Sequence, residues 1–166
     1  DFDGDGIPDY LHVEGGTWYL RRGKNPGVPI DTGLRVQNGD QPEHALVADM
    51  NSDGRTDLVT VNNVNGWYVW YSNGDGTLRA SQQGYRPAYT AQDKHPVLAD
   101  LDADGYPELL FKYTYSYSGA IALAFYKNGP DGLVNSLAYT NLIVSNGQKL
   151  IPINFTGGGT TDIYVS

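Results

Sequence analysis

Asp1-Phe2-Asp3-Gly4-Asp5-Gly6-Ile7-Pro8-Asp9 opens the chain, and the same nine-residue pattern returns at residues 49–57 and 100–108. Oxygen atoms recur at loop positions 1, 3, 5 and 9, and the carbonyl at position 7 can point the same way. Such a loop can place its oxygens around one hard cation, and calcium accepts about 6 to 8 oxygen ligands. The sequence therefore predicts a calcium site that is repeated three times.

The spacing assigns five ligands to each site. The first site would use Asp1, Asp3, Asp5, the Ile7 carbonyl and Asp9. The second would use Asp49, Asn51, Asp53, the Arg55 carbonyl and Asp57. The third would use Asp100, Asp102, Asp104, the Tyr106 carbonyl and Glu108. Glycine occupies position 6 of every loop, where the chain must turn sharply at positive φ: Gly6, Gly54 and Gly105.

An EF-hand loop opens in the same way but ends with a bidentate glutamate at position 12, on a helix. Position 12 is His12, Thr60 and Phe111 in the three loops. The segments after the loops, residues 10–13, 58–61 and 109–111, are short runs of β-branched, aromatic and other apolar residues typical of strands. The pattern therefore favours strands around each loop and excludes the EF-hand.

The loops belong to a longer repeat, because their first residues lie 48 and 51 positions apart and a degenerate copy starts 54 positions later, at Asn154. That copy keeps a carboxylate only at Asp162, so we expect its site to be empty or nearly so. We expect repeat units at about residues 1–43, 44–94, 95–148 and 149–166.

Each unit shows the pattern of about four short strands. One strand enters the loop (45–48, 96–99, 151–153), one leaves it, a third follows (16–20, 66–71, 119–126), and a Gly/Asn/Asp turn (23–27, 73–76, 128–132) leads into a fourth. A period near 50 of this kind is typical of a β-propeller blade. The predicted fold is all-β, a propeller of four-stranded antiparallel blades with calcium-binding loops. Trp18 and Trp67 recur at matching places and are expected to pack between blades.

The loops, the strands after them and the run Tyr-Ser-Asn-Gly-Asp-Gly-Thr-Leu at 71–78 resemble FG-GAP/VCBS repeats over essentially the whole chain. The departures are Asn51, Glu108 and the degenerate fourth loop. The resemblance implies an integrin-α-like calcium-binding β-propeller, a fold also found in secreted lectins, in SpvB/TcB-type toxin components and in modules attached to secreted enzymes. It implies a fold and a metal rather than one function.

Charge supports the metal prediction. The chain has 19 acidic and 11 basic residues, and 11 of the acids lie in the three loops, so three bound Ca²⁺ would bring the net charge from −8 to −2. No basic stripe for nucleic acid and no apolar membrane span is present. Calcium loops of this type suggest a secreted protein or an extracellular surface, where calcium is millimolar.

Propellers close with about 4 to 8 blades, whereas this sequence holds three and a fraction. We expect a fragment or one segment of a larger ring, with an oligomeric ring as the alternative. The protein would continue into a larger propeller or assemble with other chains.

Tyr113, Tyr115 and Tyr117 alternate along one predicted strand and so share one face of it. They are candidates for a platform that stacks on a sugar or a partner protein, or for packing between blades.

No catalytic motif is present: there is no G-x-S-x-G elbow, no H-E-x-x-H, no P-loop and no cysteine. We therefore expect no enzyme activity. The predicted function is a calcium-binding module of a secreted or surface protein that mediates protein adhesion or assembly, as in a toxin complex. A carbohydrate-binding lectin and a non-catalytic module of a secreted hydrolase remain alternatives.

Overall fold

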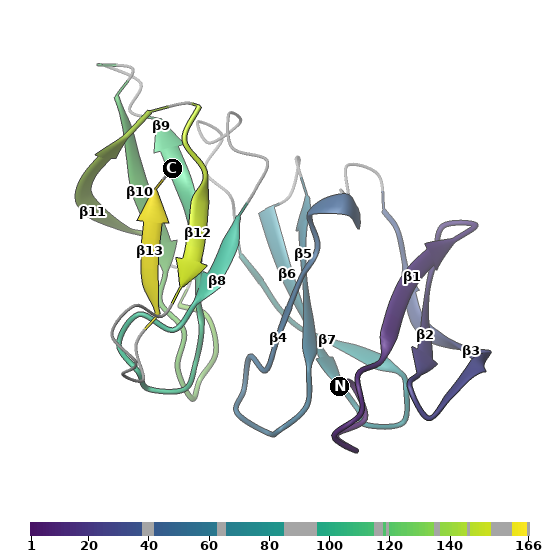
Figure 1. Cartoon of the computed structure of the whole chain (residues 1–166). Helices are drawn as coiled ribbons and strands as arrows, with labels where there is room; N and C mark the ends of the chain where they lie inside the picture. The colour runs from purple at the N-terminus through teal and green to yellow at the C-terminus, as the bar shows by residue number, and fades with distance from the viewer. Residues whose placement is uncertain are drawn as a thin grey trace. The chain divides into compact units, whose positions relative to one another are not determined.

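A computed structural model describes residues 1–37, 42–62, 66–84, 96–114, 118, 120–134, 137–145, 147–153 and 161–165. The described chain is all-β apart from one short 3-10 turn, η1 (Pro42–His44). It divides into two compact units, Asp1–Gly84 and Tyr85–Ser166 (Figure 1). No helix in the described part of the chain is long and apolar enough to cross a membrane.

The first unit begins with a sheet of order β1-β2-β3, formed by β1 (Tyr10–Glu14), β2 (Thr17–Arg22) and β3 (Asn25–Arg35). All its pairings are antiparallel. The pairs Glu14↔Thr17 and Arg22↔Asn25 each enclose a two-residue turn. The first loop therefore leads straight into the edge strand of this sheet.

The second sheet has the order β4-β5-β6-β7 and follows η1 in the chain. Its strands are β4 (Leu46–Ala48), β5 (Asp57–Asn62), β6 (Gly66–Ser72) and β7 (Leu78–Gly84). The second loop connects β4 to β5. Every residue of β5 is buried, as expected of a strand that is covered on both faces.

The second unit repeats this arrangement, with a sheet of order β11-β10-β9-β8. Its strands are β8 (Val97–Ala99), β9 (Glu108–Thr114), β10 (Ile121–Tyr126) and β11 (Leu137–Val144). A two-stranded sheet follows, made of β12 (Leu150–Ile153) and β13 (Asp162–Val165). The third loop connects β8 to β9, as the second connects β4 to β5.

The strands predicted around the loops are confirmed, since each predicted run overlaps a strand of the structure. The Gly/Asn/Asp segments 73–76 and 128–132 lie between the last two strands of their sheets, as predicted, whereas the predicted turn 23–27 is shorter, because β3 already begins at Asn25. Gly74 and Gly76 adopt φ of +79° and +98°, which explains the choice of glycine in the turn before β7.

The core of the first unit joins its two sheets. Phe2, Trp18, Leu20 and Leu34 form one buried cluster with Leu58 of the second sheet, and Trp70 and Leu78 pack against it. The predicted packing of Trp18 between repeats is thus confirmed. Trp67 is also buried, and its ring covers Gly84 of the neighbouring strand, where an added Cβ would lie 2.0 Å from the ring.

The core of the second unit is built in the same way. Ala99, Leu110 and Leu123 of the third sheet cluster with Leu150 of β12, and Ile163 and Val165 of β13 pack against them. In both units the apolar strands beside a loop are therefore fixed by contacts with the next sheet.

Candidate metal centre

The three acidic loops share left-handed backbone at two positions. Position 4 has positive φ in each, with values of 75°, 56° and 61° for Gly4, Ser52 and Ala103. Position 6 has φ of 81°, 83° and 85° for Gly6, Gly54 and Gly105. This second set confirms the sequence argument for glycine at position 6, because left-handed backbone is costly for other residues.

Backbone N–H groups hold the first aspartate in place. The N–H of position 6 donates to Oδ2 of position 1 at 2.8 Å in the first loop, 2.8 Å in the second and 3.0 Å in the third. In the first two loops the N–H of position 5 also donates to Oδ1 of that aspartate. The loop is therefore wrapped around the position 1 carboxylate.

The carboxylate at position 9 accepts hydrogen bonds from two backbone N–H groups, one near the start of the loop and one at the end of a hairpin. One donor is the position 2 residue, at 2.6 Å for Asp9, 3.0 Å for Asp57 and 2.8 Å for Glu108. The other donor lies at the end of the second strand after the loop or just beyond it: Gly23 at 2.9 Å, Ser72 at 2.9 Å and Asn128 at 3.4 Å. Position 9 thus fastens the loop entrance to the end of a hairpin.

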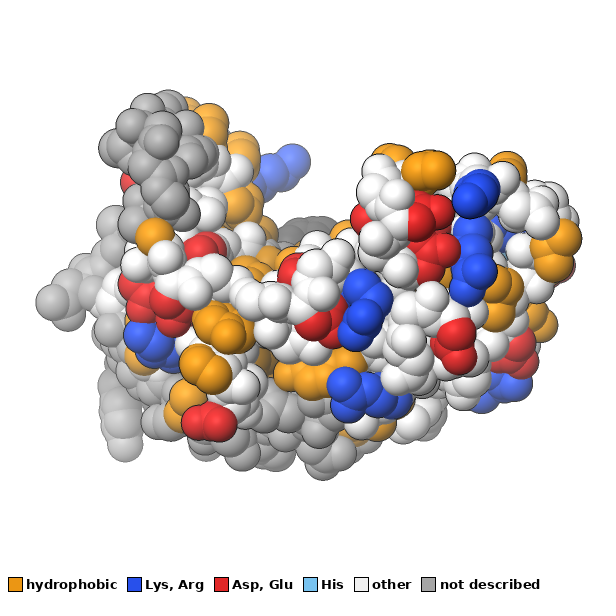
Figure 2. All heavy atoms as spheres, turned by 90° about the horizontal axis from the view of Figure 1, so that it is seen from below, with side chains coloured by type: hydrophobic (Ala, Val, Ile, Leu, Met, Phe, Trp, Pro, Cys, Tyr) orange, Lys and Arg blue, Asp and Glu red, His pale blue; other side chains and the backbone are white. Residues whose placement is uncertain are grey.

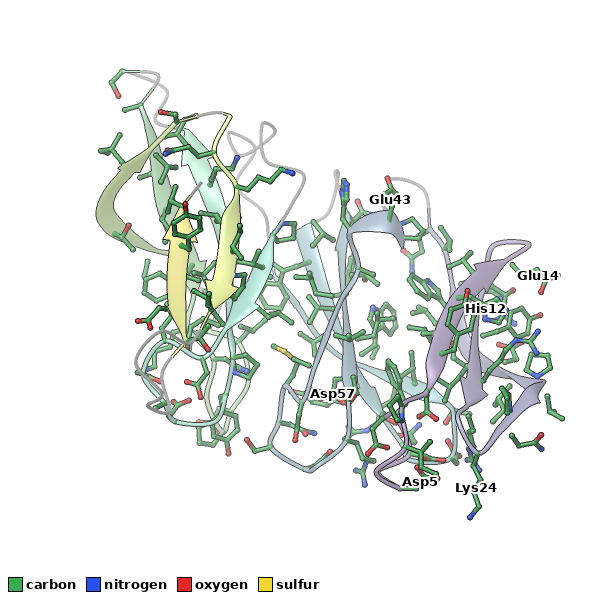
Figure 3. All side chains as sticks on the ribbon, viewed as in Figure 1. Asp5, His12, Glu14, Lys24, Glu43 and Asp57 are labelled. Atoms are coloured by element: carbon green, nitrogen blue, oxygen red, sulfur yellow. The ribbon has the colours of Figure 1, made fainter. Side chains whose placement is uncertain are left out.

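Two of these carboxylates are deeply buried, with 0% of Asp57 and 1% of Glu108 exposed. Burial raises the pKa of Asp57 to about 6, against the effect of its two N–H donors. Burial also raises the pKa of Glu108. Figure 3 places Asp57 at the start of β5, whereas Asp5 lies at the tip of the first loop. In the second and third loops the buried carboxylate lies at the base of the loop, and Asp53 and Asp104 nearer its tip are exposed.

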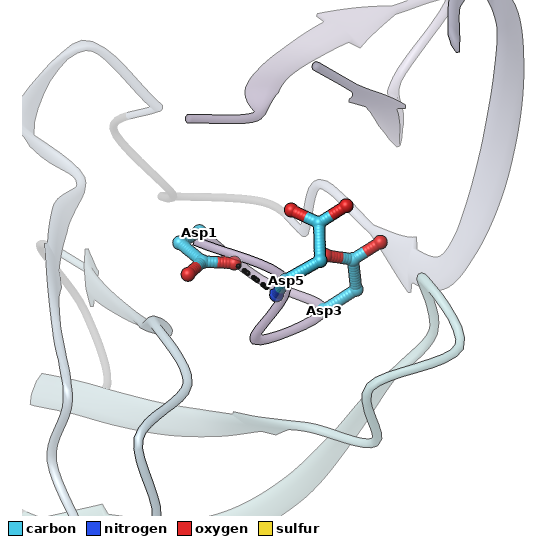
Figure 4. Close-up of side chains that lie close together, drawn as sticks. All are labelled: Asp1, Asp3 and Asp5. Atoms are coloured by element: carbon cyan, nitrogen blue, oxygen red, sulfur yellow. Dashed lines mark hydrogen bonds between the residues drawn. The ribbon is translucent and has the colours of Figure 1, made fainter. Parts of the chain in front are cut away.

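The described residues contain two groups of three carboxylates that could hold a metal ion, with ligand atoms within 4.8 Å of one another. One group is Asp1, Asp3 and Asp5 of the first loop, shown in Figure 4 with the hydrogen bond from the Asp5 N–H to Asp1. The other is Asp100, Asp102 and Glu108 of the third loop. Both groups offer only oxygen ligands, which suit a hard cation such as calcium.

The third loop also contains an oxygen with no hydrogen-bond partner among the described residues. Oδ1 of Asp100 is buried and accepts no hydrogen bond from them, although Oδ2 of the same carboxylate is bonded to the Gly105 N–H. A buried polar atom without a partner is costly unless an ion or a water satisfies it. The residues present therefore fit calcium, which would be held by the Asp100, Asp102 and Glu108 side chains and would neutralise their charge.

A basic side chain contacts each loop. Arg22 Nε lies 3.1 Å from Asp3 Oδ2, and Lys127 Nζ lies 2.6 Å from Asp102 Oδ2. In the second loop the basic residue is part of the loop itself, since Arg55 Nη2 lies 2.6 Å from Asp53 Oδ2. Figure 2, seen from the side on which Figure 3 places Asp5, shows acidic side chains lying beside Lys and Arg side chains.

The structure thus brings only part of each predicted ligand set together. Asp9 and Asp104 fall outside the two groups, and Asn51 Nδ2 donates to Asp53 in the second loop, at 3.1 Å. The carbonyls of Ile7, Arg55 and Tyr106 stay predicted ligands. Residues 154–160 of the fourth loop lie outside the described residues, as do Tyr115, Tyr117 and the side chain of Tyr113.

Sequence reasoning missed the basic partners. Arg22 and Lys127 come from the ends of β2 and β10, far from their loops in the sequence. Each directly precedes the residue whose N–H bonds to position 9, Gly23 or Asn128. Aligning the repeats on those two residues would have revealed the shared basic position.

The chain belongs to the FG-GAP-like repeat family, which matches residues 1–60 and 49–111. FG-GAP repeats imply propeller blades, in agreement with the four-stranded sheets. No curated protein sequence matches the chain.

Among solved structures, the chain is similar to part of a Tc holotoxin pore from Photorhabdus luminescens. The TM-score is 0.64 with 19% sequence identity. The match covers 96% of this chain and 8% of the toxin chain. At this level of identity the likeness concerns the fold.

Proposed function

We propose that this chain is a calcium-stabilised β-propeller segment of a larger secreted or surface protein, and that it serves in assembly or adhesion rather than catalysis. The single observation that carries the calcium assignment is the buried, unpartnered Oδ1 of Asp100 within a group of three carboxylates. Like charges held this close repel one another, and a divalent cation removes that repulsion. Calcium then acts as a structural component of the loop.

The position 9 carboxylate holds each loop to the hairpin of its own sheet, which would give bound calcium a role in the fold. Asp9, Asp57 and Glu108 each fasten a loop entrance to a hairpin end. A filled site would make that fastening rigid. The proposed ligands are the side chains of Asp1, Asp3 and Asp5 and those of Asp100, Asp102 and Glu108, with the second loop as a weaker site.

The assembly role is supported by the length of the structural relative. This chain spans 8% of the matched Tc toxin chain, so a module of this kind serves there within a much larger protein. We extend that arrangement to the parent protein of this chain, with the blades supplying a rigid surface for neighbouring domains or partners.

Calcium content tests the metal assignment. The purified chain should retain calcium after dialysis against trace calcium, and Asp3→Asn and Asp102→Asn should each reduce the retained amount. Glu43→Gln, at an exposed position of η1, is the control. Unchanged calcium content in both loop variants would refute the assignment.

The reading frame that encodes the chain tests the assembly role. Further repeats of the same kind on either side would support a structural segment. A hydrolase domain directly beside the chain would favour the alternative of a module attached to an enzyme, and binding to a glycan array would favour a lectin.

A further inference from the structure

Loop position 8 alternates along the chain between proline and threonine: Pro8, Thr56, Pro107 and Thr161. Both threonines donate their backbone N–H to the position 1 residue of the preceding loop. Thr56 N lies 2.8 Å from Asp1 O, and Thr161 N lies 2.6 Å from Asp100 O. Proline has no N–H and cannot make this bond. The bond therefore runs from the second loop to the first and from the fourth to the third.

The two acceptors are the first aspartates of the two carboxylate groups. The side chain of Asp1 belongs to one group and the side chain of Asp100 to the other. Each donor and its acceptor also lie within one compact unit. A neighbouring loop thus holds the backbone of the residue that begins each candidate site.

The donor loops are the poorer metal ligands. The second loop has Asn51 in place of an aspartate, and Arg55 already pairs with Asp53. The fourth loop keeps a carboxylate only at Asp162. Donor loops and acidic loops therefore alternate.

Arg55 adds a second contact from the second loop to the first. A Cβ on Gly4 would lie 3.2 Å from Cγ of Arg55, so the arginine stem covers position 4 of the first loop. A Cβ on Gly74 would lie 3.4 Å from Cδ of the same side chain. The arginine thus pairs with its own loop while packing on the neighbouring one.

The basic partner at the end of a strand alternates in the same way. Residues that directly precede the second N–H donor to position 9 are Arg22, Tyr71 and Lys127 in the first three repeats. Only the loops with three close carboxylates have a cation there, paired with Asp3 or Asp102. Over the first three repeats, loop position 3, loop position 8 and the residue before the second N–H donor thus all differ between the second repeat and its two neighbours.

We infer that consecutive loops work as pairs. The first loop of each pair binds calcium, and the threonine N–H of the second loop holds the first loop in shape. Thr56 and Thr161 are positioning residues, because they bond to the backbone of the ligand residue and not to the ion. This inference rests on the calcium binding proposed above.

The physical reason is the orientation of the first aspartate. Both carboxylate oxygens of Asp1 accept N–H bonds from its own loop, at 3.0 Å from Asp5 and 2.8 Å from Gly6. The Thr56 N–H anchors the Asp1 carbonyl from the second loop, so that the backbone of Asp1 is held as well as its side chain. Coupling between two sites is reciprocal, so calcium must also strengthen the Thr56 bond.

The test compares Thr56→Pro with Thr56→Ala by calorimetric titration with calcium chloride. Proline removes the N–H, and the loop geometry tolerates it, because Pro8 and Pro107 occupy the same place in loops with the same pattern of positive φ. Alanine keeps the N–H and removes only the hydroxyl, which accepts a bond from the Asp1 amine at 3.1 Å. We expect the proline variant to bind calcium about fivefold more weakly at one site, the loss typical of one hydrogen bond, and the alanine variant to match the parent.

Equal calcium affinities in the two variants would overturn the pairing while leaving the calcium sites intact. A parent chain that binds no calcium would instead refute the proposed function. Amide hydrogen exchange of the parent chain gives a second test that needs no variant. Calcium should slow exchange at the Thr56 and Thr161 amides, and unchanged exchange at both in the calcium-bound protein would contradict the inference.

Discussion

Lys127 forms an ion pair with Asp102, with 2.6 Å between Nζ and Oδ2, and it does so from the residue after β10. This cation lies beside one of the carboxylates that are proposed to hold calcium. It neutralises part of the loop charge in the metal-free protein, and it opposes a second cation at the same place. We therefore expect a residue outside the third loop to set part of the calcium affinity of that loop.

Replacing Lys127 with methionine should tighten calcium binding at the third loop by a few fold. The effect is modest, because side chains at 55% and 43% exposure interact weakly through solvent. Calorimetric titration at low and high salt measures it, and the difference should shrink at high salt. Lys149→Met removes the same charge from another exposed position. An equal gain in that control would show a general charge effect.

Asp57→Asn should destabilise the protein by about 2 to 3 kcal/mol, the cost of leaving a buried donor unsatisfied. Both Asp57 oxygens accept backbone N–H groups, from Met50 and Ser72, and the amide can accept only one of the two. Urea unfolding with excess chelator measures the change without a contribution from metal. A loss no larger than that of Glu43→Gln would contradict this role.

The Asp57 carboxyl should titrate near pH 6 in the metal-free protein, because burial raises its pKa to about 6 from an ordinary value of 3.8. A raised carboxyl pKa means that the folded state binds the proton more tightly than the unfolded state. The stability from this group is thus complete below about pH 4 and is lost as pH rises through 6. Carbon-13 titration of the side-chain carboxyl in chelator checks this, and a midpoint at or below pH 4 would exclude the buried, desolvated carboxyl.

Gly54→Ala should cost about 1 to 2 kcal/mol, because position 6 has φ of +83° and alanine is strained there. Steric crowding does not contribute to this cost, since a Cβ at Gly54 would meet no atom within 4 Å. Gly129→Ala is the matched control, with equally open space and without the positive φ. Thermal unfolding of both variants separates backbone strain from crowding, and equal losses would reject the strain.

Much of the fold could be predicted from the sequence because its signals are local. Gly6, Gly54 and Gly105 mark positive φ, and the strands beside the loops are apolar runs. The nine-residue spacing is sufficient to identify the acidic loops. Local chemistry of this kind is visible wherever a residue type suits only one conformation.

The remaining features depend on contacts between distant residues. The pairing of Arg22 with Asp3, and the bond from Thr56 to Asp1, follow from how the strands and sheets are placed. Position 9 was predicted only as a ligand, and its bonds to two backbone N–H groups depend on where the next hairpin ends. One repeat read by itself does not reveal these contacts, whereas comparing the repeats with one another does.

A thermal melt in millimolar calcium, repeated in excess chelator, tests the central claim most directly. Filled sites stabilise the folded state by mass action, so we predict a rise in Tm of about 10 °C or more, for a domain of this size. Magnesium should give a much smaller rise, because it dehydrates reluctantly and prefers a tighter octahedral site. The same Tm in calcium and in chelator would contradict the account that these loops are structural calcium sites.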